Sequence, residues 1–273
     1  ATLREKEMSD AAVPALRILN RDECPSDDRP VSDFDSNGWP QTGRDKALRA
    51  MRKAFAFHIA GDQHLGSTIQ YGIDDYRDAG FAVCVPSVSN VWPRRWYPAE
   101  PSPNPIAGQP RYTGDYEDGF GNKMTVRAVS NPVFTGLKPA RLYDRATGYG
   151  IVRFKKETRE ITIECWPRVP ESVNGSGQYP GWPITIAQED SYNRKAHGYL
   201  PTVKTNIKDP VVQVINEKDG DIVYTLRIQG KQFSPKVFED GTYAIKVGPS
   251  SDHMKTVKGL RPRPSKRVIL LKF

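Results

Sequence analysis

Residues 211–228 read VVQVINEKDGDIVYTLRI, which is two runs of β-type side chains on either side of Lys218-Asp219-Gly220. Asp-Gly between two such runs is a strong signal for a tight turn that joins antiparallel strands. The stretch therefore predicts a β-hairpin made of residues 211–215 and 222–228.

The pattern continues to the C-terminus. Asp240-Gly241 introduces a further β-type run at 242–247, and another run, 267–273, closes the chain. Four or five short strands within about 70 residues are typical of a small β-sandwich. We therefore expect residues 201–273 to form an all-β sandwich domain.

Residues 43–170 mix helix and strand signals. Apolar side chains recur at helical spacing between Ala47 and Phe55, and the apolar run 55–60 predicts a buried strand ending at Gly61. Helix alternating with strand is typical of an α/β layer. The other elements that we expect are a short helix at 69–77 and strands at 81–85, 124–129, 150–154 and 161–166, the last two forming a hairpin.

Composition marks the remaining segments. Residues 1–42 are polar and weakly periodic, so we treat them as a separate N-terminal segment. Residues 171–183 are rich in Gly, Pro and Ser, which predicts a linker over 171–200. The expected fold is thus an α/β part followed by a small all-β part, and β-rich overall.

Charge and apolar content limit the classes of function. The net charge of +8 suits anionic partners, but it is the only feature favouring nucleic acid, which we consider an unlikely partner. No apolar run approaches the roughly 18 residues of a membrane span. Cys24, Cys84 and Cys165 are too widely spaced for a zinc knuckle or a disulfide framework, which leaves their redox state open; Cys84 is expected to act as a small buried hydrophobe.

The sharpest chemical feature is Gly61-Asp62-Gln63-His64, at the end of the expected strand 55–60. Strand ends in an α/β layer are places where ligand-binding side chains gather. A carboxylate and an imidazole two residues apart are both metal ligands, so Asp62 and His64 are our candidate metal ligands. A hydrogen-bonded turn is the structural alternative for the same triplet.

This motif belongs to a longer similarity. Asp35 and Trp39 precede the expected helix, and the strand after it ends in Gly-Asp-x-His. In this order the chain resembles the C-terminal part of a PhoD-like (alkaline phosphatase D) metallophosphoesterase. The similarity covers roughly residues 33–170 and continues through Gln70-Tyr-Gly-Ile-Asp-Asp-Tyr-Arg, Trp92-Pro-Arg-Arg-Trp and Asp118-Gly-Phe-Gly-Asn.

The resemblance implies hydrolysis of phosphate monoesters or diesters at a site holding calcium, iron, zinc or manganese, with His64 and Asp62 among the ligands. It also implies that residues 43–170 are the edge of a calcineurin-like metallophosphoesterase sandwich. Arg94 and Arg95 would bind the phosphate-ester substrate, because guanidinium groups pair phosphate oxygens; the alternative is that they stack on Trp92 and Trp96. Such enzymes are exported, so we expect a periplasmic or extracellular protein, and the absence of an initiator Met agrees with a removed export signal.

The chain departs from this family in one respect. The family's earlier motifs, Asp-x-His, Gly-Asp-x-x-Asp and Gly-Asn-His-Asp/Glu, are absent from residues 1–60. We therefore expect an N-terminal segment to supply the remaining metal ligands and the chain alone to be a poor catalyst. The alternative is a non-catalytic β-rich binding or envelope protein derived from such an enzyme.

Two other stretches of the sequence resemble metal-binding motifs in part. Asp33-x-Asp35-x-Asn37-Gly38 begins like a calcium loop, but Arg44 stands where the closing glutamate is needed, which favours a turn. Asp118 and Asn122 fit the order of the second and third family motifs if Asp62 and His64 are the first. They are too close in sequence to end two separate strands.

Overall fold

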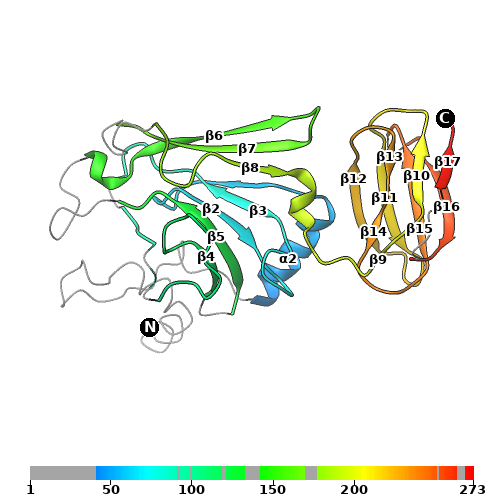
Figure 1. Cartoon of the computed structure of the whole chain (residues 1–273), viewed down its shortest axis with the longest axis horizontal. Helices are drawn as coiled ribbons and strands as arrows, with labels where there is room; N and C mark the ends of the chain where they lie inside the picture. The colour runs from blue at the N-terminus through cyan, green and yellow to red at the C-terminus, as the bar shows by residue number, and fades with distance from the viewer. Residues whose placement is uncertain are drawn as a thin grey trace.

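The computed structural model describes residues 41–90, 93–96, 98, 100–118, 121–132, 142–169, 177–250, 252–262 and 268–273. Within these residues strands predominate, and they form a larger N-terminal part and a smaller C-terminal part joined near residue 195 (Figure 1). The β-rich architecture expected from the sequence is confirmed.

The N-terminal part is built on a five-stranded sheet. Its strands, in spatial order, are β1 (His58–Ala60), β3 (Phe81–Cys84), β2 (Ser67–Tyr71), β5 (Lys123–Val129) and β4 (Gly114–Glu117). β1 and β3 run parallel, and the other neighbours are antiparallel. The segments that follow β1 and β3 therefore leave the sheet at the same edge.

A helix and a second sheet cover the two faces of this sheet. Helix α2 (Gln41–Lys53) packs through Leu48 against Ile73 and Ala79. On the other face, Val83 and Ala128 share a core with residues of the second sheet. That sheet is antiparallel and consists of β6 (Gly148–Lys155), β7 (Glu160–Pro167) and β8 (Ile184–Ala187), with the short 3-10 helices η1 (Leu142–Arg145) and η3 (Gln188–Tyr192) beside it.

The C-terminal part contains a four-stranded sheet, a three-stranded sheet and a two-stranded pair around one core. The four-stranded sheet has the order β12 (Ile222–Arg227), β11 (Val211–Asn216), β15 (Tyr243–Gly248) and β16 (Lys255–Leu260). The three-stranded sheet has the order β13 (Gln232–Phe233), β10 (Thr202–Thr205) and β17 (Val268–Leu271), and β9 (Gly198–Tyr199) pairs with β14 (Lys236–Val237). Val203, Val214 and Ile245 lie in the shared core. The hairpin predicted for 211–228 is confirmed as β11–β12, and Gly220 has the positive φ of +76° that its turn needs.

Aromatic side chains join the two parts. Phe55 follows α2 and Tyr192 ends η3, and both belong to the C-terminal core. The ring of Phe55 lies 5.8 Å from that of Tyr192 and 5.5 Å from that of Tyr224 on β12. Lys53 adds an ion pair with Asp221 at 2.6 Å. The end of α2, and with it the start of β1, is thus held by the C-terminal part.

The helix predicted for 69–77 is wrong. Residues 67–71 form β2, and a turn follows. On β2 the buried positions are Thr68 and Gln70, which are polar, so the alternation of a strand is hidden in the sequence. Both are satisfied by distant partners, because Trp182 Nε1 donates to Thr68 Oγ1 at 2.9 Å and Arg127 donates to Gln70 Oε1 at 2.6 Å.

Two other segments differ from expectation. The strand predicted for 55–60 is shorter, because Phe55 has a φ of 51° and turns into the C-terminal core instead of entering the sheet. It is also not buried, since His58 and Ile59 of β1 are exposed. Residues 184–192, which lie within the predicted linker, form β8 and η3, and β8 pairs with β7.

In the part of the chain that the structure describes, α2 and the 3-10 turns are too short and too polar to cross a membrane.

Candidate metal site after strand β1

The segment after β1 makes a turn with unusual backbone angles. Asp62 has a φ of 68° and His64 a φ of 54°, both in the left-handed region. Aspartate and histidine enter this region more readily than most residues, yet such positions persist only where surrounding contacts hold them. We call residues 61–66 the motif turn.

Two side chains from the segment after β3 hold the motif turn. Arg94 Nη1 donates to the Gln63 carbonyl at 3.1 Å and to its side-chain oxygen at 3.3 Å. Asn90 Nδ2 donates to the His64 carbonyl at 3.1 Å. Two successive carbonyls are therefore fixed from the neighbouring parallel strand. These contacts arise because β1 and β3 end at the same edge of the sheet.

The end of the motif turn packs tightly against β5. The Ser130 N–H donates to the Gly66 carbonyl at 2.8 Å. A Cβ at residue 66 would lie 2.5 Å from Ser130 Oγ and 3.3 Å from Cys165 Sγ, so only glycine fits this approach.

The two predicted metal ligands differ in exposure. The side chain of Asp62 is exposed, whereas His64 is half-buried. One carboxylate and one imidazole are ligands that suit zinc, manganese and iron better than calcium, which prefers oxygens. Among the described residues no three His, Cys, Asp or Glu side chains come together as a metal-binding group. As candidate ligands, Asp62 and His64 would supply two positions of a metal's coordination shell.

Cys84 lies beside the motif turn, which the sequence did not indicate. The residue ends β3 and is half-buried. Burial raises the pKa of its thiol, and the Asp62 carboxylate raises it further, while the Gln63 backbone and the Arg94 guanidinium lower it. Because the net shift is upward, the thiol stays protonated at neutral pH.

Arg94 and Arg95 have different surroundings. Arg94 contacts the motif turn through Gln63. Arg95 lies near Tyr112, where burial raises the pKa of the tyrosine and Arg95 lowers it. The next residue, Trp96, is fixed by donating its indole N–H to the Tyr112 carbonyl at 2.8 Å. Of the two predicted phosphate ligands, Arg94 thus contacts the motif turn directly.

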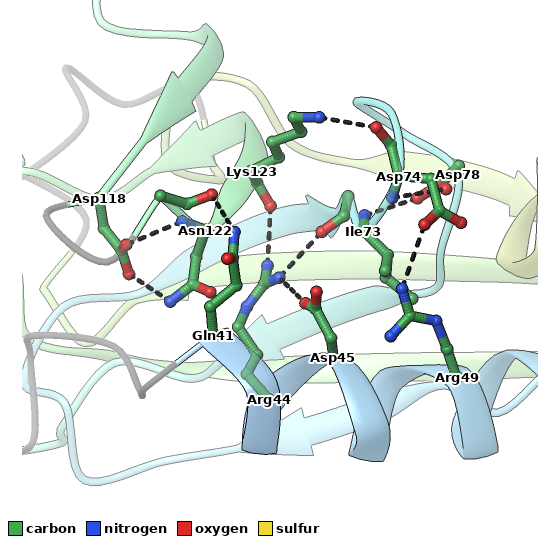
Figure 2. A network of polar contacts seen from close by, with 12 residues as sticks. Gln41, Arg44, Asp45, Arg49, Ile73, Asp74, Asp78, Asp118, Asn122 and Lys123 are labelled. Atoms are coloured by element: carbon green, nitrogen blue, oxygen red, sulfur yellow. Dashed lines mark hydrogen bonds and ion pairs between the residues drawn. The ribbon is translucent and has the colours of Figure 1, made fainter.

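Asp118 and Asn122 lie in one hairpin turn between β4 and β5 (Figure 2). The Asn122 backbone N–H donates to Asp118 Oδ1 at 3.0 Å, and its side-chain amide donates to Oδ2 at 2.8 Å. They therefore do not end two separate strands, in agreement with the sequence argument. Cys24, Asp33, Asp35, Asn37 and Trp39 of the sequence predictions, together with Trp92, lie outside the described residues.

A polar network fixes α2 to the sheet that carries the motif turn (Figure 2). Arg44 donates to the Gly72 carbonyl at 2.8 Å and to the Lys123 carbonyl at 2.7 Å. Gln41 donates to the Gly121 carbonyl at 2.9 Å. Burial lowers the pKa of Arg44, and the nearby Asp45 carboxylate opposes this shift. Sequence reasoning gave Arg44 no such role, because carbonyl acceptors carry no residue-type signal.

Asn90 is a further residue that sequence reasoning missed. The available signal was its place in the turn-type stretch Ser87-Val-Ser-Asn90, directly after a buried strand. That stretch gives no hint of its contact with His64, because the partner lies on another loop.

Comparison of the chain with models of known families, with curated proteins and with solved structures found no match.

Proposed function

We propose that this chain is part of a metal-dependent phosphoesterase of the PhoD-like class, acting on phosphate monoesters or diesters. One observation supports the proposal above the others. The Asp-x-His turn follows a strand of a parallel pair, and its Asp62 and His64 have left-handed backbone angles. Side chains from the neighbouring segment donate hydrogen bonds to the carbonyls of Gln63 and His64. Backbone strain maintained in this way is concentrated at functional sites.

In this proposal the motif turn supplies an imidazole from His64 and a carboxylate from Asp62. A metal ion bound there would polarise the phosphoryl oxygens and lower the pKa of a bound water. The chain itself presents the ligands from a fixed backbone, so little reorganisation is needed when the metal binds. The other ligands would come from a segment outside the described residues.

Arg94 is the residue that we propose for phosphate binding. Its guanidinium is hydrogen-bonded to Gln63, the residue that lies between the two proposed metal ligands in the sequence. A planar guanidinium pairs two phosphate oxygens, which an ammonium group does not. The position adds positive charge next to a site that would receive an anionic substrate.

We expect His64→Ala to weaken metal binding by at least about tenfold, because it removes a direct ligand whereas loss of an outer-shell contact already costs 10–100-fold. The measurement is titration of the purified chain with Zn²⁺ and Mn²⁺, followed by hydrolysis of p-nitrophenyl phosphate. His197→Ala is the matched control, since His197 is an exposed histidine on the loop before β9.

Equal metal affinity in the wild type and His64→Ala would contradict the assignment of His64 as a ligand. Efficient hydrolysis by the chain alone would contradict a different point, namely that further ligands come from another segment.

We expect Arg94→Lys to raise the dissociation constant for inorganic phosphate about tenfold in the presence of Mn²⁺, because the two-point contact with phosphate is lost while the charge remains. Arg95→Lys is the matched control and should change it less than about twofold. Isothermal titration calorimetry measures both. An equal loss in the two variants would mean that Arg94 has no special place in phosphate binding.

A further inference from the structure

Asn90 connects the motif turn to a second loop. The residue is fully buried, has a φ of 38° and follows β3. Its Nδ2 group donates to the His64 carbonyl at 3.1 Å and also to the Arg145 carbonyl. One side-chain amide thus joins the turn after β1 to the end of η1, which precedes β6.

The orientation of this amide follows from its partners. Two carbonyls are acceptors, so they require the NH₂ group; the reverse orientation would place the Asn90 oxygen against both of them. Oδ1 is consequently directed elsewhere, and among the described residues it has no hydrogen-bond partner. A buried acceptor without a donor costs about 1–3 kcal/mol.

This cost indicates what Asn90 contributes. A side chain that served only packing would be more stable as an apolar residue of the same shape, which has no acceptor to satisfy. The gain from asparagine lies in the two Nδ2 contacts, and one of these fixes the peptide that follows His64. Arg94 fixes the preceding carbonyl, that of Gln63. Two consecutive peptide planes are thereby held, and they lie on either side of the Cα from which the imidazole extends.

We infer that Asn90 is a positioning residue for the metal site: it holds the His64 carbonyl and so orients the His64 imidazole for metal binding. The inference rests on the proposed function, because it takes His64 to be a ligand. Asn90 itself does not contact the metal. Its removal therefore weakens metal binding through His64, as loss of an outer-shell partner does.

The test compares Asn90→Leu with wild type by NMR of the histidine rings during titration with Mn²⁺. Mn²⁺ broadens the signals of nearby rings, and the His64 signal is identified by its absence in His64→Ala. Leucine keeps the shape of asparagine and removes both Nδ2 contacts. We expect the Mn²⁺ concentration that broadens His64 to rise about 10–100-fold in Asn90→Leu.

Two further variants separate positioning from general stability. Thr147→Val removes a fully buried hydroxyl that has no hydrogen-bond partner among the described residues, close to η1 but outside the motif turn, and should leave the broadening unchanged. Serine is smaller than asparagine and still polar, so Asn90→Ser serves if the leucine variant does not fold. It should respond in the same direction as Asn90→Leu.

The outcomes distinguish the two proposals. Selective broadening of His64 in wild type that is unchanged in Asn90→Leu or Asn90→Ser would overturn the positioning role and leave the metal site standing. Absence of selective broadening in wild type would overturn the metal site itself, and the positioning role with it. A larger Mn²⁺ requirement in the Asn90 variants alone supports the inference.

Discussion

Replacing Phe55 with alanine is expected to lower the free energy of unfolding by about 3–5 kcal/mol, the range for a large buried aromatic side chain. Phe55 is 4% exposed and packs edge-to-face on Tyr224, with centroids 5.5 Å apart. Edge-to-face pairs add about 0.5–1.5 kcal/mol to the effect of burial alone.

Phe55 also connects the two parts of the molecule, so its loss should change the shape of the unfolding curve. It follows α2 but belongs to the C-terminal core with Tyr192 and Tyr224. Without it, the two parts remain coupled by Tyr192, by the exposed Lys53–Asp221 ion pair and by two hydrogen bonds at the β6–β7 turn, from Arg159 to the Ile228 carbonyl and from Gln229 to the Glu157 carbonyl. Exposed contacts of this kind contribute little. We expect a single transition in wild type to separate toward two in Phe55→Ala.

Urea unfolding followed by tryptophan fluorescence and by far-ultraviolet circular dichroism measures both effects. Phe57→Ala is the matched control, because Phe57 is half-buried and contacts the exposed ring of Phe154 at 5.9 Å. If both variants lose the same stability, or if Phe55→Ala keeps one coincident transition, the joining role of Phe55 is wrong.

The second large effect is expected for Asp78→Ala, which should lower the free energy of unfolding by about 3–5 kcal/mol because it takes away the buried partner of a buried cation. The Asp78 carboxylate is buried and lies 3.3 Å from Arg52 on α2. The side chain of Arg52 is only 6% exposed, and its other carboxylate, Asp74, is half exposed at 3.4 Å.

Asp78 also closes the turn that follows β2. Its oxygens accept hydrogen bonds from the backbone N–H groups of Ile73 at 2.7 Å and Asp74 at 3.1 Å (Figure 2). A third comes from the backbone N–H of Asp75 at 3.3 Å. Alanine would leave these donors without an acceptor, which adds to the loss of the ion pair.

Chemical denaturation of three variants tests this account. Asp78→Asn keeps an oxygen acceptor but loses the charge, and so should fall between wild type and Asp78→Ala. Asp75→Ala, an exposed neighbour, should stay within about 0.5 kcal/mol of wild type. A loss below about 1 kcal/mol for Asp78→Ala would mean that Arg52 and the turn find other partners.

The elements that the sequence alone determined are those whose signals are local. The hairpin of β11 and β12 follows from Asp219-Gly220 between two β-type runs, and α2 follows from apolar spacing at 47–55. The candidate ligands Asp62 and His64 were also found from the sequence, because the motif is contiguous and follows a strand. In each case the cause lies within a few residues of its effect.

Tertiary structure decided the features whose partners are distant in sequence. Thr68 and Gln70 are buried on β2 because Trp182 and Arg127, 114 and 57 residues away, satisfy their polar groups. No local pattern shows that a polar residue has such a partner. Without it, burial of these side chains would be unfavourable, so the local sequence does not reveal that they are the buried face of a strand.

The same reason explains which parts of the candidate site the sequence could not provide. Asn90 reaches the His64 carbonyl across 26 residues, and Arg94 reaches Gln63 across 31. Both contacts depend on the parallel pairing of β1 and β3, which brings two chain segments to one edge of the sheet. The sequence named the candidate ligands, whereas the packing of separate strands determined which residues hold their backbone in place.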